Sequence, residues 1–365
     1  MRVLHVGEIV KGGVATYLKE LINFQQKAIG NNNVFLFISQ LSEKNFNLKD
    51  SNIMVYNYKR NIFNILGTIF ELARYIKKVK PDIIHAHSSF AGLMVRVLYY
   101  FSFNKNRPKI IYCSHGWSFL MDIGRFKKKI YLFIEKVLAR KTDLIINISK
   151  YEHTQALKLG MDKEKLVLIP NGIHRHCNYD YKPDIILNNN KINILFIGRF
   201  DKQKGLDYLL NVFNNNSNYL NNIKLYTMGE SVIHKYKDLQ IPKNVSNIGW
   251  VDNKYVDSYI KLFDAIIIPS RWEGFGLVAL EGMKNKKALI VSNRGALPDL
   301  VIDGHNGFVF NFDNPKSLVS ILMKINKKQL NVMGENGYKK FISQYQSDKM
   351  NFEILKQYKK VLNIG

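Results

Sequence analysis

The sequence predicts an α/β protein built from two doubly wound parallel sheets in tandem. Short apolar runs of strand length alternate with helical segments along nearly the whole chain, which is typical of a parallel sheet covered by helices on both faces. The chain has 365 residues, a length that suits about two domains. A polar, turn-rich stretch at residues 178–190 separates two such series, so we place the domain boundary there.

The first series, residues 1–180, forms the predicted N-terminal domain. Its strands are expected at residues 3–6, 34–38, 53–56, 82–85, 109–113, 143–148 and 166–169. Helices are expected at residues 14–26, 62–79, 93–103, 126–140 and 150–159, where apolar residues recur at helical spacing. Pro81 ends the second of these helices, because proline cannot continue the helical hydrogen bonding.

The second series, residues 190–345, forms the predicted C-terminal domain. Its strands are expected at residues 192–197, 223–228, 245–249, 265–268 and 288–292. Helices are expected at residues 205–213, from residue 277 onward, and at 318–325 and 329–345. A last helix lies in residues 346–365, and we expect it to pack back toward the N-terminal domain. Ligands of such sheets bind at the carboxyl ends of the strands, so the site is expected in the cleft between the domains.

Composition indicates a globular protein with a strong positive charge. The chain is 46% hydrophobic, and its net charge is +25. This excess favours a polyanionic surface, either nucleic acid or the anionic cytoplasmic leaflet of a membrane. A strand directly after Met1 and Arg2 predicts no signal peptide, and no apolar run reaches the roughly 18 residues of a membrane span. Cys113 and Cys177 provide no disulfide framework, which fits a cytoplasmic protein.

The chain is organised around residues 264–285, DAIIIPSRWEGFGLVALEGMKN. A buried strand is followed by a glycine turn, and a helix opens at Leu277. The free N–H groups of a helix start bind anions, and Gly274 and Gly276 allow a close approach. Glu273 at the turn and Glu281 two turns into the helix are good acceptors for sugar hydroxyls. A ligand that has phosphates for the helix start and hydroxyls for the two glutamates is a sugar nucleotide. Alternatively, both glutamates are solvated residues that favour the helix dipole.

A second loop supplies cations. Residues 198–205, GRFDKQKG, place Arg199 at the end of a strand and Lys204 just before a helix. Guanidinium and ammonium groups bind a diphosphate and stabilise its charge as it leaves. The alternative is a solvated basic loop, which is common in so basic a chain.

The spacing Gly274-x-Gly276-x-x-Ala279 also fits a dinucleotide-binding fingerprint. That fingerprint requires an acidic residue at the end of the next strand. Here the next strand ends in Asn293 and Arg294, which disfavours a nicotinamide enzyme.

These motifs in this order resemble the retaining glycosyltransferases of family 4, of the bacterial surface-polysaccharide type. Their GT-B fold has two Rossmann-like domains facing across a cleft. Five stretches carry the resemblance: Glu273 to Glu281 as the E-x7-E signature, residues 198–205 as the phosphate-binding motif, residues 11–13 as the N-terminal glycine loop, IPNGI at 169–173 as the interdomain turn, and residues 296–310 as the downstream block. The chain departs from the family at His174 and Asp299, where an acidic residue and a glutamate are usual.

The resemblance implies roles for particular residues. Glu281 would bind the ribose hydroxyls of the donor, and Glu273 the hydroxyls of the transferred sugar. Arg199 and Lys204 would hold the diphosphate. The other donor-binding residues would be Gly12, Gly13, Gly274, Phe275, Gly276 and Leu277. His115 matches the family histidine near the donor sugar and the scissile phosphate, so His115 and Glu273 are the expected catalytic residues.

The resemblance also implies a reaction. An acceptor hydroxyl would attack the sugar on the face from which the nucleoside diphosphate leaves, and the leaving phosphate would accept the proton. The family needs no metal or other cofactor. The acceptor would be a glycan, expected to be a lipid-linked O-antigen or capsule intermediate. The alternatives are a nonhydrolysing sugar-nucleotide epimerase, which shares the architecture, and a basic nucleic-acid-binding protein. Glycine loops and paired acids do not serve nucleic-acid binding, so no nucleic acid is expected as a partner.

The positions of four histidines relative to the predicted strands suggest which of them have a function. His115 and His87 lie at strand ends, where a function is expected. His5 lies within a strand and is expected in the core, while His85 could belong to either class.

Residues 124–141, GRFKKKIYLFIEKVLARK, form a basic amphipathic helix. Lys127, Lys128 and Lys129 stand at its start, and we expect Phe126 and Phe119 to enter lipid there. This segment would hold the protein on the inner face of the plasma membrane. The alternative is that the apolar side packs on the sheet and the lysines are solvated.

Overall fold

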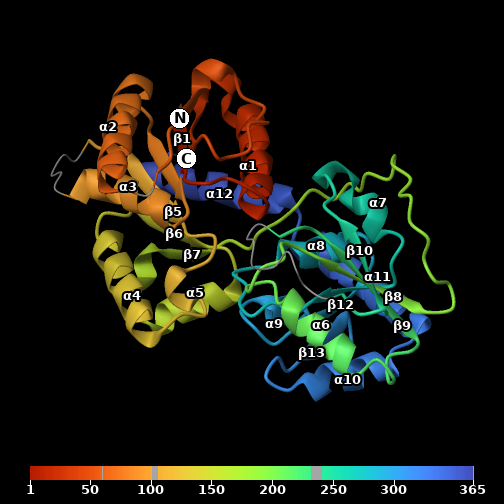
Figure 1. Cartoon of the computed structure of the whole chain (residues 1–365). Helices are drawn as coiled ribbons and strands as arrows, with labels where there is room; N and C mark the ends of the chain where they lie inside the picture. Colours follow the sequence, from red (N-terminus) through yellow and green to blue (C-terminus); the bar gives the residue numbers. More distant parts are fainter. Residues whose placement is uncertain (60, 101–105, 232–240, 365) are drawn as a thin grey trace. The chain divides into compact units, whose positions relative to one another are not determined.

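The computed structural model (Figure 1) describes residues 1–59, 61–100, 106–231 and 241–364. It divides into two compact units, Met1–His174 with Ser347–Gly365, and Arg175–Gln346. The division falls a few residues before the expected stretch at 178–190. Residues 175–190 join the second unit because they bond to it: the Asn178 amide donates to Asp257 at 3.1 Å, and the Tyr179 hydroxyl donates to Asn285 at 3.0 Å.

The first unit contains a parallel sheet of seven strands in the order β3-β2-β1-β4-β5-β6-β7. The strands are β1 Val3–Gly7, β2 Val34–Ser39, β3 Ile53–Tyr56, β4 Ile83–His87, β5 Lys109–Cys113, β6 Leu144–Asn147 and β7 Leu166–Leu168. The α-helices are α1 Gly13–Ile29, α2 Ile62–Val79, α3 Ser89–Tyr100, α4 Arg125–Ala139, α5 Lys150–Lys158 and α12 Ser347–Leu362. Short 3-10 helices are η1 Asn31–Asn33, η2 Asp50–Asn52, η3 Ser118–Leu120 and η4 Lys163–Lys165.

The second unit contains a parallel sheet of six strands in the order β10-β9-β8-β11-β12-β13. The strands are β8 Ile192–Ile197, β9 Ile223–Met228, β10 Val245–Gly249, β11 Ala265–Ile268, β12 Ala288–Ser292 and β13 Gly307–Phe310. The helices are α6 Leu206–Asn215, α7 Val256–Ile260, α8 Leu277–Lys284, α9 Leu297–Leu300, α10 Pro315–Lys324, α11 Lys327–Gln344 and the 3-10 turn η6 Asn253–Tyr255.

Burial explains why the strands could be recognised. Every residue of β11 and β12 is buried, as expected for a parallel sheet covered on both faces. Each unit has its own hydrophobic core around its sheet. The last helix, α12, lies with the first unit, where Gln25 on α1 donates to the Tyr358 hydroxyl at 3.4 Å and the Ser347 amide donates to the Ile173 carbonyl at 2.9 Å.

The predicted strands agree with the structure to within a residue or two. The helix expected at 93–103 begins earlier, at Ser89, and its residues 101–103 lie outside the described part of the chain. Strand β13 and the short helices α7 and α9 were not predicted. Among the described residues, no helix combines the length and apolar character of a membrane span.

Candidate functional site

The strand order of the second unit reverses between β8 and β11, which pair directly. Open α/β sheets bind ligands outside the carboxyl ends of the strands at such a point. The loops that leave these strands are residues 198–205 and 269–276. They are bonded to each other, because the Arg271 amide donates to the Gln203 carbonyl at 2.8 Å and Gln203 Nε2 donates to the Trp272 carbonyl at 3.2 Å. The structure thus joins the two motifs selected from the sequence.

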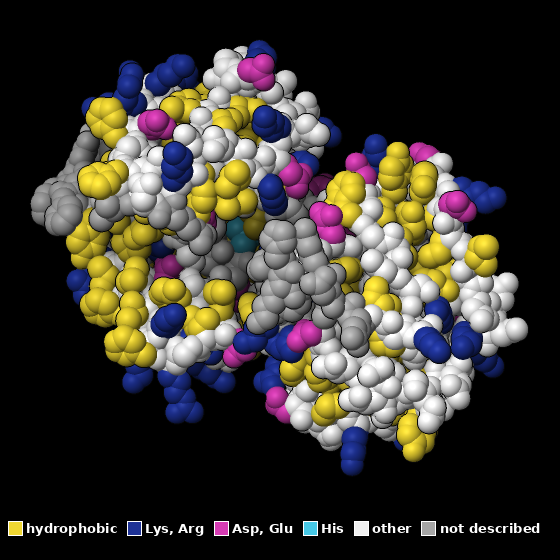
Figure 2. All heavy atoms as spheres, in the orientation of Figure 1, with side chains coloured by type: hydrophobic (Ala, Val, Ile, Leu, Met, Phe, Trp, Pro, Cys, Tyr) yellow, Lys and Arg dark blue, Asp and Glu magenta, His cyan; other side chains and the backbone are white. Residues whose placement is uncertain are grey.

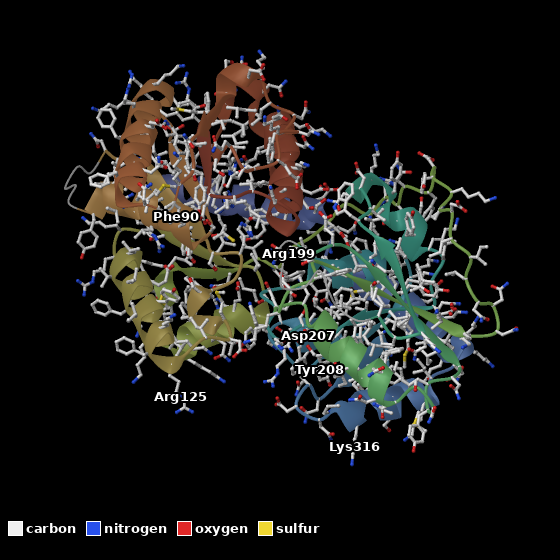
Figure 3. All side chains as sticks on the ribbon, in the orientation of Figure 1. Phe90, Arg125, Arg199, Asp207, Tyr208 and Lys316 are labelled. Carbon is white, nitrogen blue, oxygen red and sulfur yellow. The ribbon has the colours of Figure 1, made fainter. Side chains whose placement is uncertain are left out.

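Gly205 makes this close approach possible. Its φ is +71°, and a Cβ at this position would lie 2.1 Å from the Pro269 carbonyl oxygen. Only glycine accommodates both conditions. Arg271 adds a bidentate ion pair, at 2.7 and 2.8 Å, with Asp207, which lies at the start of α6 (Figure 3). The turn that carries Glu273 is therefore held at several points.

Lys204 and Glu273 form an ion pair. Lys204 Nζ donates to Glu273 Oε2 at 2.8 Å, and the Ser270 hydroxyl donates to the same oxygen at 3.1 Å. Both side chains are mostly buried. Sequence analysis assigned these residues to separate parts of a ligand and did not predict their pairing. An ammonium group has three donors, so Lys204 can hold Glu273 in place and still donate to a phosphate.

Arg199 stands apart from this pair. Its side chain is 59% exposed, and it pairs with the Asp201 carboxylate at 3.2 Å (Figure 3). The Asp201 carboxylate also accepts a hydrogen bond from the Lys204 amide at 3.0 Å. Arg199 therefore lies in the same loop as Lys204, on its solvent-accessible side.

The start of α8 supplies backbone groups. Gly276 precedes the helix with a φ of +100°, and α8 begins at Leu277. Phe275 is buried and packs edge-on against Tyr345, with ring centroids 5.9 Å apart. The side chain of Phe275 is thus structural, and only its backbone is available to a ligand. Gly274 is half-buried beside Glu273.

Glu281 lies two turns into α8, and its side chain is half-buried. Burial raises the pKa of this carboxyl to about 7, and the nearby Lys284 opposes the rise. Lys284 is itself held by the buried Asp257 carboxylate at 2.9 Å. A carboxyl with this pKa exists in both protonation states near neutral pH.

Gly295 is a site residue that the sequence analysis missed. A Cβ at Gly295 would lie 2.2 Å from the Glu273 carbonyl oxygen and 2.7 Å from the Glu273 nitrogen. The next amide, of Ala296, donates to the Glu273 carbonyl at 3.0 Å. The loop after β12 therefore braces the backbone of Glu273. The signal available in the sequence was a glycine in the loop that follows the strand at residues 288–292.

In the first unit, the strand order reverses between β1 and β4. The glycine loop follows β1. Gly12 is exposed, has a φ of +57° and precedes α1, which begins at Gly13. The Gly12 amide donates to Glu43 at 3.1 Å. Both glycines lie near the switch point of their sheet, where the sequence predicted a backbone contact with a ligand.

His115 follows β5, the neighbour of β4. Its φ is +53°, which is uncommon for a residue with a side chain. Its Nε2 lies 3.0 Å from Nδ1 of His87, and Tyr17 packs edge-on against its ring at 4.6 Å. The residue as a whole is half-buried, but burial of the ring lowers its pKa to about 3. His115 is therefore a neutral imidazole at physiological pH.

Three further histidines lie deeper in the first unit. His5 is fully buried, as predicted, and His85 and His87 are buried beside it. One ring nitrogen from each of these three lies within 4.8 Å of the others, which is a spacing that a metal ion could use. However, His5 Nδ1 and His87 Nε2 lie 3.0 Å apart and form a hydrogen bond with each other.

Helix α4 buries Leu138 and Ala139 but leaves several of its other apolar residues exposed. Its buried side carries Glu135, whose carboxylate pairs with Arg96 at 2.7 Å and accepts from the Tyr112 hydroxyl at 3.0 Å. Its apolar residues Phe126, Ile130, Phe133 and Ile134 are exposed, and Figure 2 shows hydrophobic side chains gathered along α4. The alternative in which the apolar side packs and the lysines are solvated therefore holds for the end of the helix, where Leu138 is buried, and not for its start.

The three lysines at the start of α4 differ in their exposure to solvent. Lys127 and Lys129 are exposed and Lys128 is half-buried, while Phe126 is 76% exposed. The expectation for Phe119 is wrong. Only 3% of Phe119 is exposed, because its ring stacks on Trp117 at 4.9 Å. Phe119 is a core residue and is not available to lipid.

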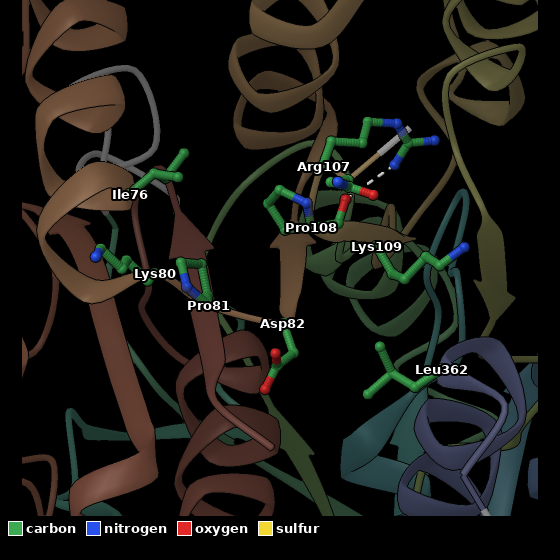
Figure 4. A pocket seen from close by; sticks show the side chains of 9 residues that line it. Ile76, Lys80, Pro81, Asp82, Arg107, Pro108, Lys109 and Leu362 are labelled. Atoms are coloured by element: carbon green, nitrogen blue, oxygen red, sulfur yellow. Dashed lines mark hydrogen bonds between the residues drawn. The ribbon is translucent and has the colours of Figure 1, made fainter. Parts of the chain in front are cut away.

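A pocket of about 310 Å³ lies at the amino ends of the strands of the first sheet, opposite the first unit's part of the candidate site (Figure 4). It is lined by Asp82 and Lys109, next to the amino ends of β4 and β5, and by Leu362 of α12. Ligands of open α/β sheets bind at the carboxyl ends, so this pocket is not part of the candidate site.

The geometry describes a two-unit α/β protein in which a cationic loop and a glutamate-bearing turn meet at the switch point of the second sheet. Comparisons with known proteins agree with this class. The model of Glycosyltransferase Family 4 matches residues 11–176, and the model of Glycosyl transferases group 1 matches residues 180–340. The chain belongs to this family of glycosyltransferases and has the GT-B fold.

Several relatives extend over most of the chain. An uncharacterized 41.2 kDa protein in the cps region of Klebsiella pneumoniae is 37% identical and covers 88% of this chain and 89% of its own. The uncharacterized glycosyltransferase MJ1178 of Methanocaldococcus jannaschii is 31% identical and covers 77% of this chain and 76% of its own. An Escherichia coli enzyme named UDP-Gal:alpha-D-GlcNAc-diphosphoundecaprenol alpha-1,3-galactosyltransferase is 25% identical, covering 84% of this chain and 81% of its own.

Solved structures share the fold at low sequence identity. A sucrose-phosphate synthase from Thermosynechococcus elongatus has a TM-score of 0.81 at 17% identity, covering 100% of both chains. Anabaena HepE, solved with UDP and glucose, has a TM-score of 0.79 at 16% identity, covering 98% of this chain and 99% of its own. These comparisons favour neither the epimerase nor the nucleic-acid-binding alternative. The chain is a glycosyltransferase.

Proposed function

We propose that this protein is a retaining, metal-independent glycosyltransferase that transfers a hexose from a UDP-sugar to a lipid-linked glycan in surface-polysaccharide assembly. The observation that carries the proposal is the pairing of the cationic loop with the glutamate turn at the β8/β11 switch point. Relatives named for UDP-galactose transfer and for O-antigen biosynthesis support the choice of donor and pathway.

In this proposal Lys204 and Arg199 hold the diphosphate, together with the amides at the start of α8. Glu281 accepts hydrogen bonds from the ribose hydroxyls. Glu273, fixed by Lys204 and Ser270, accepts from hydroxyls of the transferred sugar. Fixed donors at the leaving diphosphate stabilise the charge that develops there.

In the first unit, His115 contacts the transferred sugar, and Gly12 and Gly13 offer backbone to the phosphates and acceptor. The acceptor hydroxyl attacks the face that the diphosphate leaves, and a phosphate oxygen takes the proton. The paired state of Glu273 supports this route, because a carboxylate held by an ammonium and a hydroxyl is a poor nucleophile.

A thermal-shift panel of UDP-, GDP- and ADP-sugars tests the donor. A ligand that binds only the native state raises the melting temperature, so UDP-sugars are expected to give the largest rise. Glu281→Gln should reduce that rise, and Glu273→Ala should reduce turnover more than UDP affinity. Equal melting temperatures with and without every sugar nucleotide would contradict the proposal.

We further propose that α4 docks on the anionic cytoplasmic face of the plasma membrane. Exposed Phe126, Phe133 and neighbouring apolar residues would enter the interface, while lysines meet the lipid headgroups. Helix α3 contacts both α4 and α2, and α2 adds exposed apolar residues, Phe63, Leu66 and Phe70. Charge and apolar surface thus occur together, which suits an anionic bilayer.

Co-sedimentation with vesicles tests this docking. Changing Lys127, Lys128 and Lys129 to glutamate should weaken binding to phosphatidylglycerol vesicles by roughly a hundredfold, at about 1 kcal/mol for each lysine removed. The matched control changes three exposed lysines of the second unit to glutamate, namely Lys316 (Figure 3), Lys324 and Lys328, and should bind like the parent. Equal binding by both variants would show that α4 is not the docking element.

A further inference from the structure

A chain of hydrogen-bonded side chains runs from α1 to His115 through the interior of the first unit. Gln25 Oε1 lies 2.8 Å from His5 Nε2, His5 Nδ1 lies 3.0 Å from His87 Nε2, and His87 Nδ1 lies 3.0 Å from His115 Nε2. Gln25, His5 and His87 are each no more than 1% exposed. The proposed reaction uses only His115, so the three buried members need another explanation.

The imidazoles of this chain are neutral. Burial lowers the pKa of His5 to about 4 and that of His115 to about 3, and it places the pKa of His87 well below its usual value. A neutral imidazole has one N–H donor and one nitrogen acceptor. Each ring that donates on one side must therefore accept on the other, and the orientation of one ring decides the orientation of all three.

The Gln25 amide sets the direction. Its oxygen faces His5, and an amide oxygen can only accept. His5 therefore carries its proton on Nε2 and accepts at Nδ1. His87 then carries its proton on Nε2 and accepts at Nδ1, and His115 carries its proton on Nε2. The remaining nitrogen of His115, Nδ1, is left as a bare acceptor for a ligand.

Helix α12 holds the amide in this orientation. The nitrogen of Gln25 donates to the Tyr358 hydroxyl at 3.4 Å, and that hydroxyl lies 2.6 Å from His85 Nδ1. The hydroxyl can accept from Gln25 and donate to His85 at the same time. His85 Nε2 is buried without a hydrogen-bond partner among the described residues, so the branch ends there.

We propose that Gln25, His5 and His87 are positioning residues that fix His115 in its Nε2–H form, so that its Nδ1 accepts a hydrogen bond from a hydroxyl of the transferred sugar. The proposal rests on the proposed function, which places His115 at the sugar. A hydroxyl that donates its proton to a neutral nitrogen gains electron density, which favours a sugar that becomes positively charged as the diphosphate leaves. His115 is then an acceptor in the reaction and not a general acid.

The test reads the tautomer directly. Two-bond ¹H–¹⁵N spectra of the full chain labelled with ¹⁵N-histidine distinguish the Nδ1–H and Nε2–H forms of each ring. The chain has nine histidines, so the His115 signals are assigned by their loss in His115→Gln. We expect His115, His87 and His5 all in the Nε2–H form. An Nδ1–H form of His115 in the unmodified protein would overturn the proposal, whether or not the enzyme transfers sugar.

Two substitutions at Gln25 separate tautomer control from packing. Gln25→Met fills the space without an acceptor, so the chain can reverse, and His115 should populate both forms. Gln25→Glu, buried and protonated, keeps an acceptor toward His5 and a donor toward Tyr358, so it should preserve the Nε2–H form. With the UDP-sugar that the thermal-shift panel selects, Gln25→Met should lower kcat about three- to tenfold at unchanged donor KM, the scale of one hydrogen bond, and Gln25→Glu should restore it.

Further outcomes are decisive. If Gln25→Met leaves the His115 tautomer unchanged, the chain does not control it, and the proposal fails. A stoichiometric metal ion in the purified protein, bound by His5, His85 and His87, would also overturn it, because the metal would occupy lone pairs that the chain requires. The expected tautomers in a protein that binds no UDP-sugar would instead contradict the proposed function and leave the hydrogen-bond chain standing.

Discussion

Replacing Gly295 with alanine should impair catalysis without contact between the new side chain and any ligand. The added Cβ would lie 2.2 Å from the Glu273 carbonyl oxygen and 2.7 Å from its nitrogen, while real Cβ atoms essentially never come within 3.0 Å of such atoms. The φ of +60° fixes the direction of the Cβ, and the atoms it meets are backbone. The Glu273 turn must therefore move by most of an ångström.

A movement of this turn would disturb the ion pair between Glu273 and Lys204. Glu273 is held 2.8 Å from Lys204, so displacement of its backbone disturbs the carboxylate and the ammonium together. A misplacement of about 1 Å can cost on the order of a hundredfold in rate. We therefore expect Gly295→Ala to lower kcat by about ten- to a hundredfold. The effect on UDP affinity should be smaller, because Glu281, the proposed ribose ligand, lies two turns into α8 and away from the displaced turn.

Gly304 provides the matched control. It has a φ of +75°, so alanine there carries a similar backbone cost of about 1–2 kcal/mol, but its Cβ would meet nothing within 4 Å. Initial rates of sugar transfer and melting temperatures should be measured for both variants. Similar melting temperatures with slow transfer in Gly295→Ala alone are expected. If Gly295→Ala transfers sugar as fast as Gly304→Ala, the bracing of Glu273 by this loop has no role in catalysis.

Three further predictions follow from the same geometry. Because the pKa of Glu281 is about 7 and its carboxylate is the better acceptor, affinity for a UDP-sugar measured by calorimetry should rise about tenfold from about pH 6 to about pH 8, and Glu281→Gln should flatten this dependence. Lys204→Ala should weaken UDP binding by about 1.5–3 kcal/mol and Arg199→Ala by less, since Arg199 is more exposed, while activity should survive EDTA; loss of activity that magnesium restores would contradict the cationic clamp. Glu135→Ala should lower unfolding free energy in urea by about 3–5 kcal/mol, because it leaves the Arg96 guanidinium buried and unpaired; a loss below about 1 kcal/mol would contradict this.

Most of the fold could be predicted because buried parallel strands are continuous apolar runs. Strands such as β5, β8 and β11 have the predicted bounds, and at most one residue of each is not buried. The strand β13 was missed because GFVF is short and follows a glycine-rich turn. Helices α7 and α9 have only five and four residues, too few for a periodic pattern.

The sequence motifs predicted which residues belong to the candidate site, but they did not predict the contacts between those residues. Motif spacing located Glu273 and Lys204, but these residues are 69 positions apart in the sequence, and no spacing rule predicts a hydrogen bond between them. Their pairing depends on β8 and β11 being neighbours, which is a property of strand order. The bracing by Gly295 depends in the same way on β12 pairing with β11. Long-range contacts of this kind require the assembled sheet.

Helix α4 shows why an amphipathic pattern alone cannot tell which side of a helix is packed. The usual argument assigns the apolar side to the core, because burial of a charge is costly. Here Arg96 from α3 lies over the ring of Tyr112 and pairs with Glu135, so the charge of Glu135 is compensated inside the unit. The sequence gives no sign of this pairing, since Arg96 and Glu135 are 39 positions apart. Once Glu135 faces inward, the turn of the helix carries Phe126, Phe133 and Ile134 outward. The buried ion pair and the buried Leu138 and Ala139 on the same side of α4 together hold these side chains outward, so losing the pair should alter vesicle binding as well as stability.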